Sequence, residues 1–153
     1  MTIYSFLLFS LLSIFLQVFY NADISWMTEL NRALSGRLAY GNYAYNTYGI
    51  SLWGQAIEYV DILDADKNNK LFVVDSGYLK VLLDQGFFIF FFILCAFFRL
   101  GTRIVKNNNI YLGLALILLL LDILVNPHLL LISFNPFIFL LAYANKNINA
   151  VYI

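Results

Sequence analysis

The sequence carries little charge and almost no cysteine. Charged residues make up 12% of the 153 residues and the net charge is zero, whereas soluble domains usually carry about 25% charged residues. This balance gives no indication of a nucleic-acid partner. The single cysteine, Cys95, excludes a disulfide within the chain and a cysteine-based metal cluster. Because Cys95 lies in an apolar run, we interpret it as a packing residue and expect no metal site.

Apolar residues are abundant instead. They make up 62% of the chain, against about 45–50% in soluble domains. They are concentrated in four runs, at about residues 3–20, 78–98, 110–125 and 129–143. A bilayer core of about 30 Å needs roughly 20 helical residues, so the first two runs predict membrane spans. The last two are shorter and predict a tight hairpin around Pro127.

These runs predict an all-α, polytopic membrane protein with four transmembrane helices in a single membrane domain, residues 1–153. The first run has no Lys or Arg before it and no good cleavage site, which favours a retained span over a signal peptide. Arg99, Arg103 and Lys106 fall in the predicted short link between the second and third runs. By the positive-inside rule this link is cytoplasmic. The loop over about residues 21–77 then lies outside.

The external loop has a helical pattern in its first part. Apolar residues recur at spacings of three and four at Met27, Leu30, Leu34 and Leu38. This spacing predicts an amphipathic helix over Met27–Tyr40. Ser25 or Thr28 is placed to cap it, and Gly36 is a point at which it can break.

An aromatic stretch follows, with Tyr40, Tyr43, Tyr45, Tyr48 and Trp53 separated by glycines. Two interpretations stay open for these side chains. They can form a belt at the membrane surface, where Tyr and Trp are enriched. They can also form a sugar-binding surface, in which aromatic faces stack on glycan rings. Both can hold for different residues.

Acidic residues occur at three further places in the chain. The segment Asp61–Lys70 lacks the glycine and glutamate of a calcium-binding loop, so we expect a solvated turn. Asp75 precedes the second run, where it is either a helix N-cap or a carboxylate that faces a cleft. Asp122 lies near the outer end of the third run and either pairs with His128 or is solvated.

Three short motifs follow one another along the chain, and their order is informative. Leu34–Arg37 reads LSGR, Tyr48–Gly54 reads YGISLWG, and Asp75–Gly86 has the pattern D-x-x-Y-L-x-x-L-x-x-x-G. In this order they resemble the C-terminal third of bacterial polysaccharide polymerases of the Wzy type, in the O-antigen ligase/polymerase superfamily. The resemblance covers about Met27 to Asn145.

The resemblance implies a membrane glycosyltransferase of the GT-C kind in the bacterial inner membrane, with the large loop extracytoplasmic. Such an enzyme joins oligosaccharide repeat units carried on undecaprenyl pyrophosphate into capsular, exo- or O-antigen polysaccharide. It implies no nucleotide sugar, metal or other cofactor.

The resemblance also implies roles for particular residues. Arg37, and after it Arg32, would stabilise the departing pyrophosphate. Asp75 stands where ligase-type relatives have a histidine, and it would act as a base or orient the sugar. The residues expected to contact the substrate are Asn31, Tyr45, Tyr48, Trp53 and Tyr78.

Members of this family carry many more spans than four. We therefore expect the chain to be a fragment, or a subunit completed by an N-terminal portion on another chain. Flippase and chain-length proteins are further expected partners, besides the bilayer and the lipid-linked glycan. The alternative is a non-enzymatic accessory protein of polysaccharide assembly. A transporter is disfavoured because the runs hold few polar residues for a path.

Overall fold

The regular elements in the part of the chain that the structure describes are all helices. The computed structural model describes residues 4–57, 74–131 and 133–143. The helices in these ranges are α1 (Ser5–Val18), α2 (Ser25–Ala33), α3 (Arg37–Tyr48), α5 (Gly77–Lys106), α6 (Ile110–Asp122) and α7 (Phe137–Tyr143). These ranges contain no strand, so the predicted all-α class is confirmed. The predicted turn over Asp61–Lys70 lies outside the described residues.

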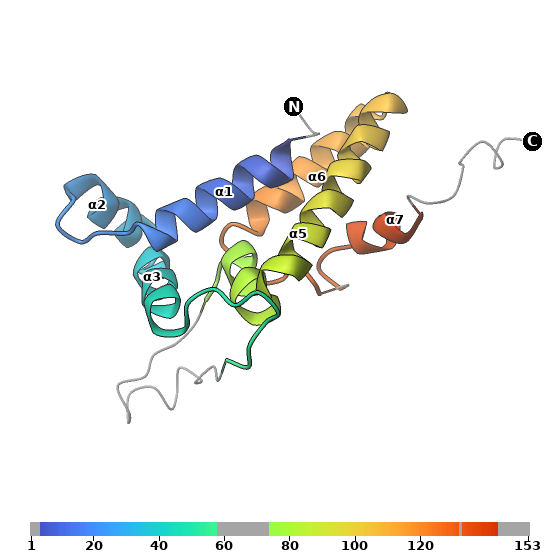
Figure 1. Ribbon diagram of the computed structural model, residues 1–153. Coiled ribbons are helices and arrows are strands. Elements are labelled where there is room, and N and C mark those ends of the chain that lie inside the picture. The colour runs from blue at the N-terminus through green and yellow to red at the C-terminus, as the bar shows by residue number, and fades with distance from the viewer. Residues whose placement is uncertain (1–3, 58–73, 132, 144–153) are drawn as a thin grey trace, which may run out of the picture.

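Helices α1, α5 and α6 pack together around a shared apolar core (Figure 1). The ring of Phe6 on α1 lies 4.6 Å from Phe97 and 5.3 Å from Tyr78, both on α5. Tyr78 is fully buried, and its hydroxyl donates a 2.8 Å hydrogen bond to the carbonyl of Leu120. This carbonyl belongs to the last turn of α6, where intrahelical partners run out. Tyr78 therefore ties the three helices together.

Helix α1 buries its polar side chains and exposes many of its apolar ones. Ser10, Ser13 and Gln17 are at most 4% exposed, whereas Leu11 and Phe15 are more than half exposed. The polar residues recur at spacings of three and four, so they form one stripe of the helix. That stripe faces the rest of the protein, the reverse of the orientation that water favours.

Helix α5 is broken at Gly86. Gly86 has φ 83° and ψ 173°, a conformation that only glycine adopts readily. The segment after the break is about 20 residues, or roughly 30 Å, long. By length and composition α5 is the one helix in the described ranges that can cross a membrane; α1 and α6 are apolar and shorter.

The helix that contains the second run extends beyond the predicted C-terminal end of that run. Helix α5 continues to Lys106, so Arg99, Arg103 and Lys106 lie on the helix and not in a link. The turn to α6 is formed by residues 107–109 alone. Asn109 ends this turn as the N-cap of α6, its side-chain oxygen accepting from the amide of Leu112 at 3.0 Å.

The segment after α6 differs from the predicted fourth span. Residues 129–131 and 133–135 are not helical, and the helix in this described part is α7, Phe137–Tyr143. Asn135 explains part of the difference, because its side chain donates to the carbonyl of Leu129 at 2.7 Å and closes a compact turn. Asp122 accepts from Asn126 at 2.7 Å and not from His128, whose ring stacks on Phe134.

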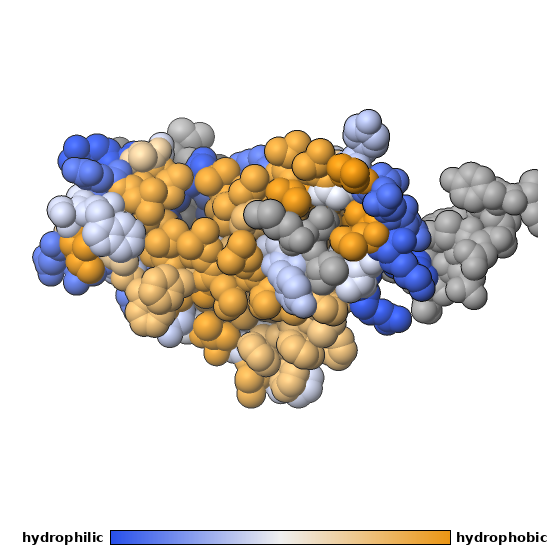
Figure 2. Space-filling model, turned by 90° about the horizontal axis from the view of Figure 1, so that it is seen from above, coloured by the Kyte–Doolittle hydropathy of each residue, from blue (hydrophilic) through white to orange (hydrophobic). Residues whose placement is uncertain are grey.

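Polar residues gather at two ends of the molecule. Figure 2 shows an apolar band across the middle of one face, with the most hydrophilic residues toward its two ends. One end holds α2 and α3, and the other holds the end of α5 and the start of α6 (Figures 1 and 2). The N-terminus of α1 lies at this second end, because the rings of Tyr4 and Phe98 are 5.8 Å apart.

Candidate functional site

The turn between α2 and α3 places Arg37. The predicted helix over Met27–Tyr40 is in fact two helices, separated at Ser35 and Gly36, which both have positive φ angles. Asn31 holds this turn: its carbonyl accepts from the amide of Gly36 at 2.8 Å, and its side-chain oxygen accepts from the amide of Ala39 at 3.1 Å. Arg37 follows as the first residue of α3.

Arg37 forms an ion pair with Asp75. Its Nε donates to Asp75 Oδ2 at 3.0 Å, across 38 residues of sequence. The side chains are 37% and 25% exposed, so water screens the pair and it adds at most about 1 kcal/mol to stability. Among the described residues, the Nη groups of Arg37 have no hydrogen-bond partner. The pair therefore orients the guanidinium and leaves its outer edge open.

Ser76, and not Asp75, is the N-cap of α5. The Ser76 hydroxyl accepts from the amide of Leu79 at 3.4 Å, so the cap predicted for Asp75 is wrong by one residue. Ser76 also shares a buried 2.7 Å hydrogen bond with Ser13 on α1. The cap leaves the neighbouring carboxylate of Asp75 available to Arg37.

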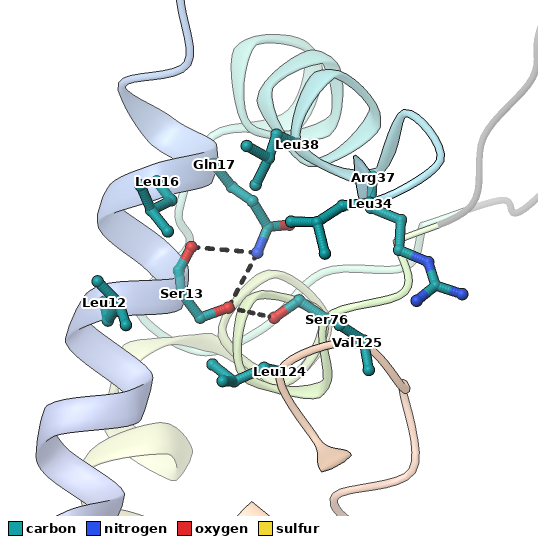
Figure 3. Close-up of a pocket in the computed structure, with 10 residues that line it drawn as sticks. All are labelled: Leu12, Ser13, Leu16, Gln17, Leu34, Arg37, Leu38, Ser76, Leu124 and Val125. Carbon is teal, nitrogen blue, oxygen red and sulfur yellow. Dashed lines mark hydrogen bonds between the residues drawn. The ribbon is translucent and has the colours of Figure 1, made fainter. Parts of the chain in front are cut away.

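A cavity of about 130 Å³ opens beside this ion pair. Its apolar walls come from α1, the α2–α3 turn and the residues after α6, with Leu12, Leu16, Leu34, Leu38, Leu124 and Val125 as lining side chains. Figure 3 shows the Arg37 guanidinium turned away from the polar residues Ser13, Gln17 and Ser76. The cavity thus offers an apolar interior with a cation near its rim.

Buried hydrogen bonds connect the polar residues that line the cavity. Gln17 Nε2 donates to the hydroxyl and the carbonyl of Ser13 at 3.0 Å and 3.1 Å, and Ser13 bonds Ser76 (Figure 3). Gly41 of α3 allows Gln17 to fit, because a Cβ there would lie 2.0 Å from Gln17 Oε1. The network fixes α1 against both α3 and the start of α5.

The glycine-rich loop after α3 caps the break in α5. The amides of Phe87 and Phe88 donate to the carbonyls of Ser51 and Leu52 at 2.9 Å and 3.2 Å. Gly54 packs directly on Gly86, where a Cβ would lie 2.3 Å from the Gly54 amide nitrogen. The carbonyls of the loop thereby accept hydrogen bonds from backbone amides that have no helical partner because of the break.

Most of the other predicted site residues lie apart from the ion pair. Arg32 is exposed in the last turn of α2, and Asn31 supports the turn described above. Tyr45 is half-buried and Tyr48 is 37% exposed on α3. Trp53, whose ring centroid lies 4.8 Å from that of Phe88, is 80% exposed.

Tyr78 has the least accessible position of the predicted substrate contacts. It is 0% exposed in the core, and its hydroxyl is engaged by Leu120. In this arrangement Tyr78 offers no atom to a substrate, so its burial gives no support to the substrate contact predicted for it.

Sequence reasoning missed Ser13, Gln17 and Ser76. The signal was present in the first apolar run, where Ser10, Ser13 and Gln17 are its polar members at helical spacing. Within the described ranges, no group of three His, Cys, Asp or Glu side chains is placed to hold a metal ion.

The chain was compared with family models, curated proteins and solved structures, and none of these comparisons gave a match. Inferences about function therefore start from the ion pair, the cavity and the apolar surface.

Proposed function

We propose that the chain is a membrane protein with four spans and an extracytoplasmic loop over residues 21–77. The observation that supports this is the reversed orientation of α1. In water, exposing Leu11 and Phe15 while burying Ser13 and Gln17 would be unfavourable. In lipid, apolar side chains can face the acyl chains while small and polar residues pack between helices. A bilayer therefore accounts for this helix better than water does.

The two polar ends support the proposed orientation. Arg99, Arg103 and Lys106 lie near the end of α5, next to the N-terminus of α1, and the positive-inside rule assigns this end to the cytoplasm. The opposite end holds the Arg37–Asp75 pair, which would then face outward. Three of the four proposed spans rest on α1, α5 and α6. The fourth, over residues 129–143, stays a prediction, because α7 is too short to cross a bilayer core by itself.

We propose further that the chain contributes one wall of a polysaccharide polymerase in the bacterial cell membrane. The observation that carries this proposal is the contact in space between the three segments on which the resemblance rests. Arg37 from LSGR bonds Asp75 at the start of the third segment, and Gly54 from YGISLWG packs on Gly86 at its end. Segments tens of residues apart in sequence thus surround one region.

The proposed reaction forms a bond between an acceptor hydroxyl oxygen and the anomeric carbon of the donor glycan. The bond from that carbon to the pyrophosphate oxygen breaks, and the electron pair leaves with undecaprenyl pyrophosphate. Arg37 would stabilise the developing charge through its open Nη edge. Asp75 would accept the hydrogen bond from Arg37 Nε through Oδ2. Its other oxygen, Oδ1, would face the acceptor hydroxyl and orient or accept the proton of that hydroxyl.

The cavity suits a lipid-linked donor. Its apolar walls would receive the first part of the polyprenyl chain, and Arg37 at the rim would contact the phosphates. Tyr45, Tyr48 and Trp53 stay predictions for the glycan, with Arg32 as a second cation for the phosphates. No nucleotide sugar, metal or other cofactor enters this proposal.

Polymer formation in membranes tests the assignment. The chain is expressed with the portion that completes it, in cells that lack the polymerase, and the length and yield of the polymer are measured. We expect Arg37→Ala to lower the yield by about 100-fold, the loss typical of a donor that stabilises developing charge. Arg32→Ala removes the second cation, so we expect a smaller loss. Arg99→Ala, at an exposed position of the opposite end of the molecule, is the matched control. Unchanged polymer with Arg37→Ala, at equal protein in the membrane, would show that the catalytic assignment is wrong.

The second candidate is a non-enzymatic accessory protein of polysaccharide assembly. The observation that favours it is that Arg37 and Asp75 balance each other's charge, as a structural pair does. In that case the exchanged double variant Arg37→Asp/Asp75→Arg would keep the polymer unchanged. A polymerase would lose activity with the same exchange, because the cation would move away from the phosphates.

A further inference from the structure

An exposed aromatic surface surrounds the break in α5. We call it the break surface and define it by Leu52, Trp53, Phe87, Phe88 and Phe91. Each of these side chains is between 38% and 80% exposed. The rings contact one another: Trp53 lies 4.8 Å from Phe88, and Phe87 lies 6.4 Å from Phe91. Aromatic rings from two segments therefore form one patch on the outside of the bundle.

The loop holds Trp53 rigidly within this surface. Hydrogen bonds flank it on both sides, from the amide of Phe88 to the carbonyl of Leu52 at 3.2 Å and from the amide of Gln55 to the carbonyl of Asp84 at 3.0 Å. The close contact of Gly54 with Gly86 adds a third attachment. The position of Trp53 is therefore set by α5 and not by a free loop.

The length of α5 places this surface at a definite depth. The helix after Gly86 is roughly 30 Å long, which matches the thickness of a hydrocarbon core. Its basic residues, Arg99, Arg103 and Lys106, lie in the last part of the helix, and long basic side chains there reach toward the interface. If that end meets one interface, the break at Gly86 meets the other.

We propose that the break surface is a membrane anchor that sits at the headgroup boundary of the extracytoplasmic leaflet. Its occupant is lipid: the phenylalanines contact acyl chains, and the indole of Trp53 lies among the glycerol and headgroup atoms, where tryptophan is favoured. The proposal rests on the membrane part of the proposed function and not on the enzyme. It reassigns Trp53 from glycan to lipid.

The anchor also sets the height of the candidate site. The short helical segment between Gly77 and Gly86 joins the Arg37–Asp75 pair at one end to the break surface at the other. Since this segment is only nine residues, or roughly 13 Å, long, the anchor holds the guanidinium close to the plane of the lipid phosphates.

The two tryptophans of the chain allow a direct test. Trp26→Phe leaves Trp53 as the single fluorophore, and Trp53→Phe leaves Trp26 as the control. Each full-length variant is reconstituted into phosphatidylcholine vesicles whose acyl chains carry bromine near the headgroup or near the chain middle. Iodide added to the water reports exposure on the aqueous side. Alkaline carbonate extraction is performed on the same vesicles to measure membrane integration.

We expect Trp53 fluorescence to be quenched about twofold more by bromine near the headgroup than by bromine at the chain middle. Quenching of Trp53 by iodide alone, in protein that resists carbonate extraction, would overturn the anchor and leave the membrane proposal standing. Protein that carbonate removes would overturn both. A response of Trp53 to soluble oligosaccharide and not to brominated lipid would return it to the glycan.

Discussion

The two halves of α5 both contain many apolar residues but have different surroundings. In the half before Gly86, Tyr78, Leu79 and Leu83 are 0% exposed. In the half after it, Phe91 and Phe92 are 50% and 70% exposed. The first half is enclosed by α1, α3, α6 and the loop that caps the break. The second half packs on α1 and α6 along one side, and its other side has no cover among the described residues.

This difference shows what each half requires from its surroundings. The first half is stabilised by protein packing, because Tyr78, Leu79 and Leu83 are fully enclosed. For the second half we propose lipid as the surroundings, because its exposed phenylalanines would be costly in water. Gly86 divides the enclosed half from the exposed half. Substitutions on either side of it test this difference.

The largest effect is expected for Gly86→Ala. The backbone conformation costs a non-glycine residue roughly 1–3 kcal/mol, and the clash of the new Cβ with Gly54 adds about 1–3 kcal/mol more. The free energy of unfolding in detergent micelles measures the loss. The two halves of α5 should then separate, and protease cleavage near the break should increase.

Gly49→Ala is the matched control for this substitution. Gly49 has a similar backbone conformation, φ 65° and ψ −175°, but a Cβ there would have no neighbour within 4 Å. The Gly49→Ala variant should therefore lose only the free energy that the backbone conformation costs a non-glycine residue, with no added clash. Equal losses for the two variants would show that the contact between Gly54 and Gly86 contributes nothing.

The next effect concerns the uncovered side of the second half. Phe92→Arg places a charge on the face assigned to lipid, which should disfavour membrane insertion by about 2–3 kcal/mol. Gln85→Arg, at an exposed position of the first half, should insert normally. The fraction of protein that resists carbonate extraction measures both. Normal insertion of Phe92→Arg would place this face against water or polar protein.

A smaller effect is expected within the covered half for Tyr78→Phe. The substitution removes the hydrogen bond to Leu120 and leaves that carbonyl without this partner, at a cost of about 1–2 kcal/mol. Equilibrium unfolding in micelles provides the value. Because Tyr78 is buried, polymer formation should fall only in proportion to the folded protein. A loss of activity without a loss of stability would restore Tyr78 to the substrate site.

Several elements of the fold could be predicted from the sequence. The helices α1 and α6 begin and end within a few residues of the apolar runs, because apolar composition and helical spacing decide them locally. The end of α5 could not be predicted, because charged residues such as Arg99 and Arg103 are typical of a link between spans. In the structure these residues continue the helix. The fourth span was overestimated, since the hydrogen bond from Asn135 to Leu129 depends on a tertiary turn.

The candidate site was predicted in part. Arg37 and Asp75 were named from their motifs, and the structure brings them within 3.0 Å. Arg32 and Asn31 are close to Arg37 in sequence but are not part of the ion pair, because the turn at Ser35 and Gly36 changes the direction of α3 relative to α2. The cavity and the polar residues that line it were not predicted, since they combine residues from four separate segments.

By itself, the sequence determined that the chain is helical, rich in apolar surface and poor in charge outside one loop, because these properties depend on composition and local spacing. Which apolar residues are enclosed and which are exposed depends on tertiary contacts, such as the packing of Gly54 on Gly86 and of Ser13 on Ser76. Those contacts join distant segments at a few ångströms, a distance relation that no local pattern encodes.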